Sequence, residues 1–126
     1  MKLRYLTAGE SHGPALCGII EGLPAGIRVE QSDFTALLRR RRAGYGRGAR
    51  ARIETDEVEV ISGIIGGLTT GSPVALTIRN RDFEKHAAYM HPFTADVEAG
   101  RINVPLPGHA DLAGTIRYGL HDCRPI

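Results

Sequence analysis

The sequence has no tryptophan, four tyrosines, three phenylalanines and only two cysteines among its 126 residues. Cys17 and Cys123 are too few for the disulfide framework of a small secreted domain, and no metal-ligand spacing includes them. No apolar run approaches the ~18 residues of a membrane span, and the first residues lack the apolar core of a signal peptide. We therefore expect a cytoplasmic protein with no membrane partner.

Lysine is also scarce, since Lys2 and Lys85 are the only two among sixteen basic residues and the other fourteen are arginines. The formal net charge is only +2, which excludes a general polycation. Seven of the arginines fall between Arg39 and Arg52. Arginine offers planar, bidentate contact to carboxylate and phosphate groups, so this segment is a candidate anion site.

The chain length suits one domain over residues 1–126. Apolar and polar alternation predicts strands over 3–7 and 57–61, and runs bounded by turn residues predict strands over 15–20 and 74–78. Ser32 and Asp33 are candidate N-caps of a helix that ends near 43–44, with the helical spacing of Phe34, Leu37 and Leu38, and apolar residues four apart predict a last helix over 110–120. Residues 80–107 show no periodicity. The order favours an α+β fold with a four-stranded antiparallel sheet and helices packed on one of its faces.

Arginines dominate the end of the first predicted helix and the glycine-rich loop after it. Consecutive arginines on a helix point in different directions, so at most two of Arg39–Arg42 can face one site, whereas Arg47 and Arg50 can converge from the loop. The alternative is a solvated basic helix end that complements the helix dipole. Nucleic-acid binding is disfavoured, because Tyr45 is the only aromatic residue within the cluster that could stack on a base.

Two histidines lie beside glycines at element ends. His12 follows the first predicted strand in Gly9-Glu10-Ser11-His12-Gly13, and His109 precedes the last predicted helix in Pro107-Gly108-His109-Ala110-Asp111. An imidazole can exchange protons near neutral pH, so each is a candidate catalytic group. The alternatives to catalysis are structural. His12 would be a hydrogen-bonded turn residue, and Asp111 would only satisfy the first turn of the helix after His109. The remaining histidines have no partnering pattern, and we interpret them as surface or structural residues: His86, His91 and His121.

Taken together, the segments resemble the chorismate synthase family. The run Thr7-Ala8-Gly9-Glu10-Ser11-His12-Gly13 resembles its N-terminal signature, and Arg-Arg-Arg-x-Gly-Tyr-Gly-Arg-Gly-x-Arg, ending at Arg50, resembles its basic loop. The hairpin from Ser62 to Asp82 and the run from Pro107 to Gly114 also match, in the family's order. The resemblance covers almost the whole chain.

The resemblance implies a carbon–oxygen lyase of the shikimate pathway, which serves aromatic amino acid biosynthesis. The reaction would be 1,4-anti elimination of phosphate from 5-enolpyruvylshikimate 3-phosphate to chorismate, with reduced FMN and, in some members, NADPH as its source of electrons. By motif position, Ser11, Arg41, Arg47 and Arg50 would bind this phosphorylated dicarboxylate. His12 would lie beside the leaving phosphate, and His109 beside the flavin, which Arg41 and Arg47 would also contact.

The sequence also departs from the family pattern. Leu106 replaces the arginine usual before Pro-Gly-His, Ala51 replaces a methionine, and Phe83 and His86 stand where tryptophans are common. The chain resembles the N-terminal portion of the family, half of a β-α-β sandwich, or a short paralogue. We therefore expect weak or no activity from a lone monomer, and a homo-oligomer, dimeric or tetrameric. The alternative function is a non-catalytic paralogue that binds anions or regulates and that oligomerises.

Overall fold

The computed structural model describes residues 2–42, 57–96 and 98–126. The chain divides into two compact units. The strand unit comprises residues 1–8 and 16–79, and the histidine unit comprises residues 9–15 and 80–126. The single domain expected over residues 1–126 stays a prediction.

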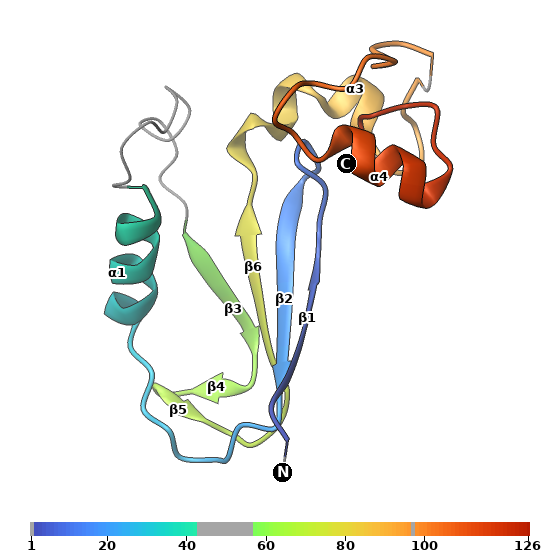
Figure 1. Cartoon of the computed structure of the whole chain (residues 1–126). Coiled ribbons are helices and arrows are strands. Elements are labelled where there is room, and N and C mark those ends of the chain that lie inside the picture. Colours follow the sequence, from blue (N-terminus) through green and yellow to red (C-terminus); the bar gives the residue numbers. More distant parts are fainter. Residues whose placement is uncertain (1, 43–56, 97) are drawn as a thin grey trace. The chain divides into compact units, whose positions relative to one another are not determined.

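The strand unit contains a four-stranded sheet of order β1-β2-β6-β3 (Figure 1). Its strands and the small hairpin between them are β1 (Arg4–Ala8), β2 (Ala15–Glu21), β3 (Val58–Ser62), β4 (Ile64–Ile65), β5 (Leu68–Thr69) and β6 (Val74–Arg79). β1 pairs antiparallel with β2, β3 pairs antiparallel with β6, and β2 and β6 run in opposite directions (Figure 1). The predicted four-stranded antiparallel sheet is confirmed, with strand ends displaced by one residue.

Glycine determines how β3 turns into the small hairpin. The register of the β3–β6 pair shifts between Val60 and Ser62, and Gly63 follows with a φ of +84°. A Cβ atom at Gly63 would lie 2.6 Å from the carbonyl oxygen of Pro73 and 2.6 Å from Cα of Val74. Only glycine accepts both this backbone conformation and this close approach.

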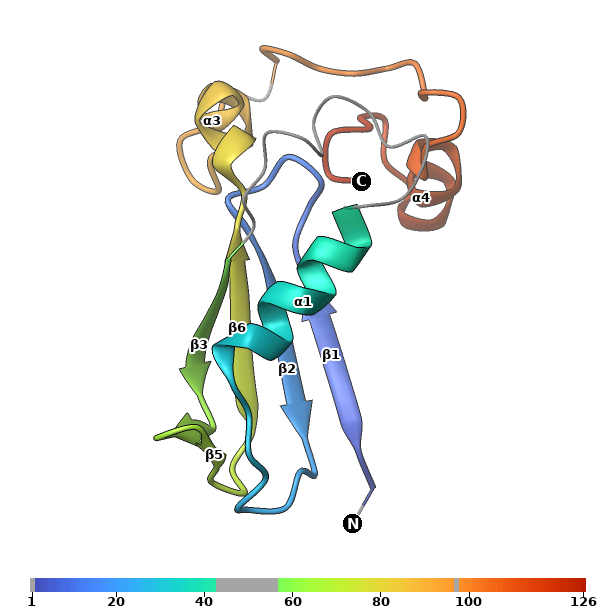
Figure 2. The same ribbon diagram turned by 90° about the vertical axis from the view of Figure 1, so that its left-hand side faces the viewer.

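Helix α1 (Gln31–Arg42) lies over one face of the sheet (Figure 2). The helix begins slightly earlier than predicted, because Asp33 acts inside the first turn and not as the N-cap. Its carboxylate Oδ2 accepts a hydrogen bond from the Glu30 N–H at 2.9 Å, and its own N–H donates to the Glu30 carbonyl at 3.0 Å. Within the described parts of the chain, no helix combines the length and the apolar character that crossing a membrane requires.

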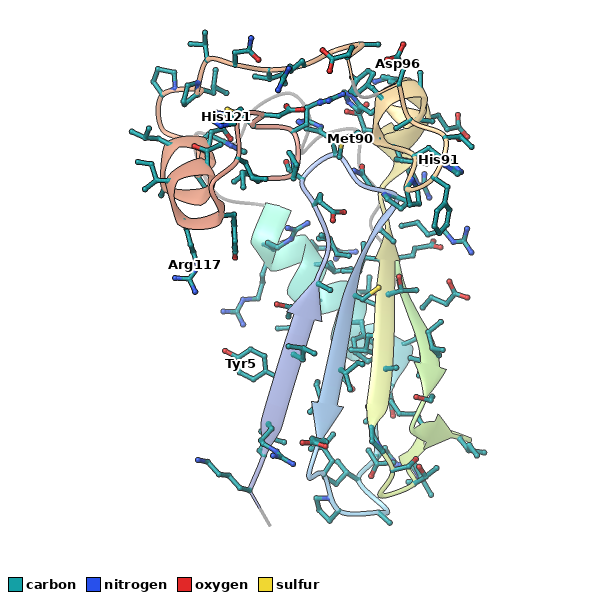
Figure 3. All side chains as sticks on the ribbon, turned by 90° about the vertical axis from the view of Figure 1, so that its right-hand side faces the viewer. Tyr5, Met90, His91, Asp96, Arg117 and His121 are labelled. Carbon is teal, nitrogen blue, oxygen red and sulfur yellow. The ribbon has the colours of Figure 1, made fainter. Side chains whose placement is uncertain are left out.

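Little of the strand unit's apolar surface is covered. Leu38 of α1 and Val74 of β6 are buried, but Tyr5 is 79% exposed and Ile61 is 61% exposed. Figure 3 shows Tyr5 extending away from β1 into the solvent. Burial of side chains therefore contributes little to this sheet, which depends on its main-chain hydrogen bonds.

The histidine unit contains three short helices, η1 (Arg81–Lys85), α3 (Ala87–Met90) and α4 (Asp111–Tyr118). Helix α4 confirms the predicted last helix and ends at Gly119, which is left-handed with φ of +64° and ψ of +33°. The first two lie in the stretch without periodicity. Helices of five and four residues are too short to repeat an apolar position.

Candidate functional site

The loop between β1 and β2 carries His12 and is fixed by one side chain from far along the chain. Asn80 Nδ2 donates hydrogen bonds to the carbonyl oxygens of Ser11 at 3.2 Å and Gly13 at 3.0 Å, on either side of His12. The Asn80 main-chain N–H donates to the Pro14 carbonyl at 3.0 Å. Asn80 also caps η1, since its Oδ1 accepts from the Asp82 N–H at 3.1 Å. One residue therefore joins the His12 loop to the helix that follows β6.

A second imidazole lies against His12. The ring centroids of His12 and His86 are 4.5 Å apart, with an interplanar angle of 46°. His86 Nε2 lies 3.2 Å from Oδ2 of Asp82, and its Nδ1 is hydrogen-bonded to the Tyr89 hydroxyl. The side chains of His86 and Asp82 are only 20% and 21% exposed. The sequence left His86 as a surface or a structural residue, and its low exposure favours the structural interpretation.

His109 is held by a buried carboxylate. Its Nδ1 pairs with Oδ1 of Asp111, whose side chain is 7% exposed, while the His109 side chain is 39% exposed. The other carboxylate oxygen, Oδ2, accepts from the Leu106 N–H at 2.9 Å. These contacts reach back from α4, so Asp111 does more than cap the first helical turn.

The hydrogen bond from the Leu106 N–H, and then that from His109, hold the pKa of Asp111 below its ordinary value, against the effect of burial. Positive charge on His109 and on His12 lowers this pKa further. His12, from the first loop, and His109, from before the last helix, therefore act on one carboxylate inside the histidine unit. An Asp111 that is ionised at neutral pH also favours a proton on Nδ1 of His109, which leaves Nε2 for a ligand.

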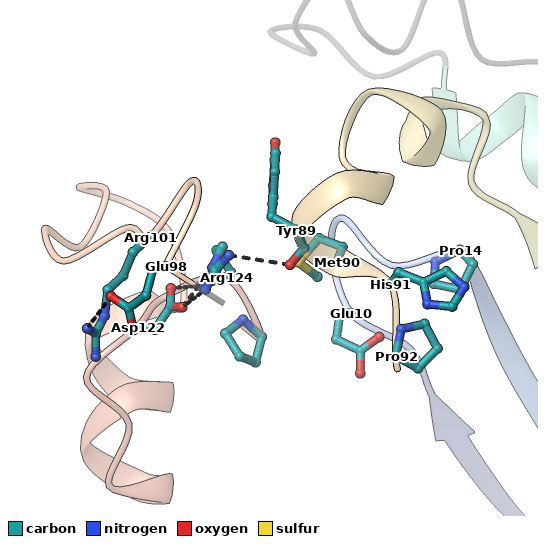
Figure 4. Close-up of a pocket in the computed structure, with 11 residues that line it drawn as sticks. Glu10, Pro14, Tyr89, Met90, His91, Pro92, Glu98, Arg101, Asp122 and Arg124 are labelled. Atoms are coloured by element: carbon teal, nitrogen blue, oxygen red, sulfur yellow. Dashed lines mark hydrogen bonds and ion pairs between the residues drawn. The ribbon is translucent and has the colours of Figure 1, made fainter. Parts of the chain in front are cut away.

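A cavity of about 600 Å³ lies in the same unit (Figure 4). Its lining combines apolar and charged side chains, namely those of Glu10, Pro14, Tyr89, Met90, His91, Pro92, Glu98, Arg101, Asp122, Arg124 and Pro125. Neither His12 nor His109 is among its described lining residues. The cavity is therefore a separate feature of the histidine unit, and neither His12 nor His109 lines it.

Arg124 stabilises the cavity wall. It is 6% exposed, and its Nε and NH2 groups donate to Oδ2 of Asp122 at 2.7 Å and 2.5 Å. Its NH1 donates to the carbonyl oxygen of Ala99 at 2.7 Å. The same group donates to the carbonyl oxygen of Tyr89 at 3.3 Å (Figure 4). Burial opposes ionisation of Asp122, but the hydrogen bonds from Arg124 and from the Ile102 N–H, together with the charge of Arg124, outweigh it and lower the pKa of Asp122. This arginine is structural.

The other predicted site residues are placed only in part. Ser11 is half-buried beside His12, and Arg41 is exposed in the last turn of α1, in the strand unit. Arg47 and Arg50 lie outside the described residues, so convergence of the arginines with the histidines stays a prediction.

Sequence reasoning missed the partners of His12. Asp82 and His86 are four residues apart, the spacing that places two side chains on one side of a helical turn. That spacing was a usable signal, but a turn this short has no apolar stripe to reveal it. The role of Asn80 carried no local signal, because its partners lie 67 and 69 residues away.

A family model described as chorismate synthase matches residues 3–126. The chorismate synthases of Chlorobium luteolum and Chlorobium phaeovibrioides are 54% and 55% identical to this chain over 125 residues, or 98% of it. The chain spans about a third, 32%, of the length of these two relatives. A crystal structure of a chorismate synthase matches with a TM-score of 0.66 and 38% identity, over 98% of this chain and 27% of the other.

Proposed function

Because the chain belongs to the chorismate synthase family, we propose that it contributes two histidines to the site of a phosphate-eliminating lyase. The substrate would be 5-enolpyruvylshikimate 3-phosphate and the product chorismate, a step of aromatic amino acid biosynthesis. The observations that support this proposal are that the histidine unit contains both His12 and the paired His109 and Asp111, and that positive charge on either histidine lowers the pKa of Asp111.

The arginines would bind the substrate's anionic groups. The substrate carries one phosphate and two carboxylates, and guanidinium groups contact both kinds of anion through paired hydrogen bonds. We assign this role to Arg41, Arg47 and Arg50, with Ser11 as a hydroxyl donor beside the phosphate. Leu106 cannot donate such a hydrogen bond, so the anion would rely on the remaining arginines.

His12 would act on the leaving phosphate. Elimination breaks the carbon–oxygen bond to phosphate, and negative charge develops on the departing oxygen. An imidazolium hydrogen bond or proton transfer to that oxygen stabilises the transition state. The two Asn80 hydrogen bonds on either side of His12 would hold the main chain that carries the imidazole for this contact.

His109 would contact the flavin. The donor set fits this role, because Asp111 occupies Nδ1 of His109 and the 39% exposed side chain leaves Nε2 for a ring atom of the cofactor. Reduced FMN, when bound, supplies electron density that assists loss of phosphate and is not consumed overall. We also assign flavin contacts to Arg41 and Arg47. In the same proposal, NADPH would supply the electrons that reduce the flavin.

Release of inorganic phosphate from the substrate, measured anaerobically with reduced FMN, tests the proposal. We expect His12→Ala and His109→Ala each to lower turnover about 10²-fold or more, the usual effect of removing an acid–base group. His121→Ala is the matched control, because it removes an exposed histidine of the same unit (Figure 3). Equal turnover in all four proteins would contradict the proposal.

The alternative of a non-catalytic, anion-binding or regulatory paralogue predicts another pattern. Such a protein would bind the substrate, with affinity that falls on Arg41→Ala, but would release no phosphate even with reduced FMN. We also expect FMN to bind the lone monomer only weakly, because the chain spans 32% of its relatives and would supply part of the flavin contacts. Tight 1:1 binding of FMN to the monomer, followed by fluorescence, would contradict this expectation.

We further propose that the chain forms a homo-oligomer, a dimer or tetramer. The support is the apolar surface that both units leave to solvent, including Leu6 at 68% and Ile116 at 74% exposure. Sedimentation equilibrium tests this directly, with a monodisperse monomer as the contradicting result.

A further inference from the structure

We propose that His12, Asp82 and His86 form a binding site for one divalent transition metal ion of the zinc class. One ligand atom from each residue lies within 4.8 Å of the other two. Two imidazoles and a carboxylate are a donor set typical of Zn²⁺, Co²⁺ and Ni²⁺ and unlike the all-oxygen sites of Mg²⁺ and Ca²⁺. The site goes beyond the proposed elimination, which needs no such ion. Because a metal-bound His12 cannot donate a proton to the leaving phosphate, the metal-bound and catalytic states of His12 exclude each other.

The spacing of the donors is close to that of coordination. Zinc bonds of about 2.1 Å in a tetrahedral arrangement place ligand atoms roughly 3.4 Å apart. His86 Nε2 and Asp82 Oδ2 are 3.2 Å apart, which matches that separation. His12 completes the group, since its ring is tilted against that of His86 with the two centroids 4.5 Å apart. A contraction of roughly 1 Å around the third donor would convert the cluster into a coordination sphere.

The surrounding contacts already orient the ligands. The Tyr89 hydroxyl binds Nδ1 of His86, which leaves Nε2 for the contact with Asp82. Histidine ligands of metals usually have their second ring nitrogen held in this way. Asn80 anchors both sides of the site, because it fixes the His12 loop and caps the helix that carries Asp82. Little ordering therefore remains to be achieved on binding.

Lys85 places a positive charge beside Asp82 and so opposes a bound cation. Its Nζ lies 2.6 Å from Oδ1 of Asp82, the oxygen that faces away from the His86 contact. The Lys85 side chain is 78% exposed, so its ammonium group is well hydrated and the ion pair is weak. The ammonium lowers metal affinity without occupying the Oδ2 position.

Titration of the chelator-treated protein with Zn²⁺ by calorimetry, and with Co²⁺ by visible absorption, tests the site without any measurement of activity. We expect one saturable equivalent and a Co²⁺ spectrum of low-symmetry coordination. His86→Ala and Asp82→Asn should weaken binding at least about 100-fold, and Tyr89→Phe about tenfold, as for a lost outer partner. Lys85→Ala should tighten binding by about threefold, since it removes a weak, exposed competitor.

His121→Ala is the control histidine and should bind Zn²⁺ as the unaltered protein does. Circular dichroism identifies any variant that fails to fold, and Tyr89→Phe and Lys85→Ala keep all three ligands in place. Absence of one saturable equivalent, or equal affinity in His86→Ala, Asp82→Asn and His121→Ala, would overturn the site. Because the readout is metal binding, its failure is distinct from a failure of phosphate elimination.

Discussion

The strand unit and the histidine unit are held together by different kinds of contact. In the strand unit, β1 and β2 pair residue by residue from Arg4 and Glu21 to Ala8 and Cys17. In the histidine unit, single side chains bind main-chain carbonyls far away, as Asn80 does at Ser11 and Arg124 does at Ala99. The first arrangement repeats along the chain, whereas the second depends on individual residues.

This difference predicts where substitutions are tolerated. An exposed side chain of the sheet can change with little loss, because the main-chain hydrogen bonds remain. A buried polar side chain of the histidine unit leaves several unsatisfied groups when it is removed. The strand unit should therefore be sensitive mainly at its turns and at Thr69, whose buried hydroxyl binds the Pro24 carbonyl and the Ile27 N–H. The histidine unit should be sensitive mainly at its anchoring side chains.

Gly63→Ala should have the largest effect and identifies the sensitive turn of the strand unit. The positive φ and the two 2.6 Å approaches to Pro73 and Val74 both oppose a methyl group. We expect the free energy of unfolding, measured with urea, to fall by about 3–4 kcal/mol, the sum of backbone strain and overpacking. Gly66→Ala is the control, since its φ of +58° is also positive but nothing lies within 4 Å. A loss as small as the ~1 kcal/mol expected for Gly66→Ala would contradict the steric argument.

Arg124→Met should have the next largest effect. The substitution keeps an unbranched apolar chain but leaves Asp122 without its cation and two carbonyls without their donor. We expect a loss of about 3 kcal/mol in urea unfolding, as for one partner of a buried ion pair. Arg28→Met, at an exposed position of the strand unit, should change stability by less than about 0.5 kcal/mol. Equal losses at both positions would remove the distinction between the units.

Asn80→Ala should cost about 2 kcal/mol, because three hydrogen bonds are lost from partly buried groups. The amides of the loop 9–15 should also exchange with solvent faster than in the unaltered protein. Asn103→Ala is the matched control at an exposed position. Unchanged exchange in the loop of Asn80→Ala would mean that other contacts hold His12.

The smallest effect is a dependence of stability on acid pH. The pKa values of Asp111 and Asp122 are both lowered from 3.8, so their ionised forms stabilise the fold above about pH 3.8. This stabilisation is lost progressively as pH falls below 3.8 and through the lower pKa values of the folded protein. Urea midpoints between about pH 6 and pH 2 should fall less steeply for Asp122→Asn than for the unaltered protein. Glu84→Gln is the control, because it removes an exposed carboxylate of the same unit. An equally shallow pH dependence of the urea midpoint in Glu84→Gln would contradict the assignment of this effect to Asp122.

Pattern alone was sufficient for the main strands and the helix of the strand unit. Alternating residues place β3, the run after a glycine-rich turn places β6, and the helical spacing of Phe34, Leu37 and Leu38 places α1. The small hairpin of β4 and β5 lies within the predicted turn, since two-residue strands have no alternation to read.

The candidate site could be predicted only by motif and not by pattern. His12 and His109 were found because glycines and family motifs surround them. The partners of His12 were harder to find. Asn80 acts across 67 residues, and Asp82 lies on a helix of only five residues with His86 directly after it, so their spacing is the only signal that they share. The burial of Arg124 was equally hidden, since an arginine near the end of the sequence reads as a surface residue.

The central claim is that His12 and His109 serve one reaction site, and a double-mutant cycle on phosphate release tests it most directly. Turnover is compared among the unaltered protein, His12→Ala, His109→Ala and the double variant, with reduced FMN. Groups that act as a unit are non-additive, so the double variant should lose about as much turnover as the worse single variant. Losses that multiply, so that about 10²-fold in each becomes about 10⁴-fold in both, would contradict the claim.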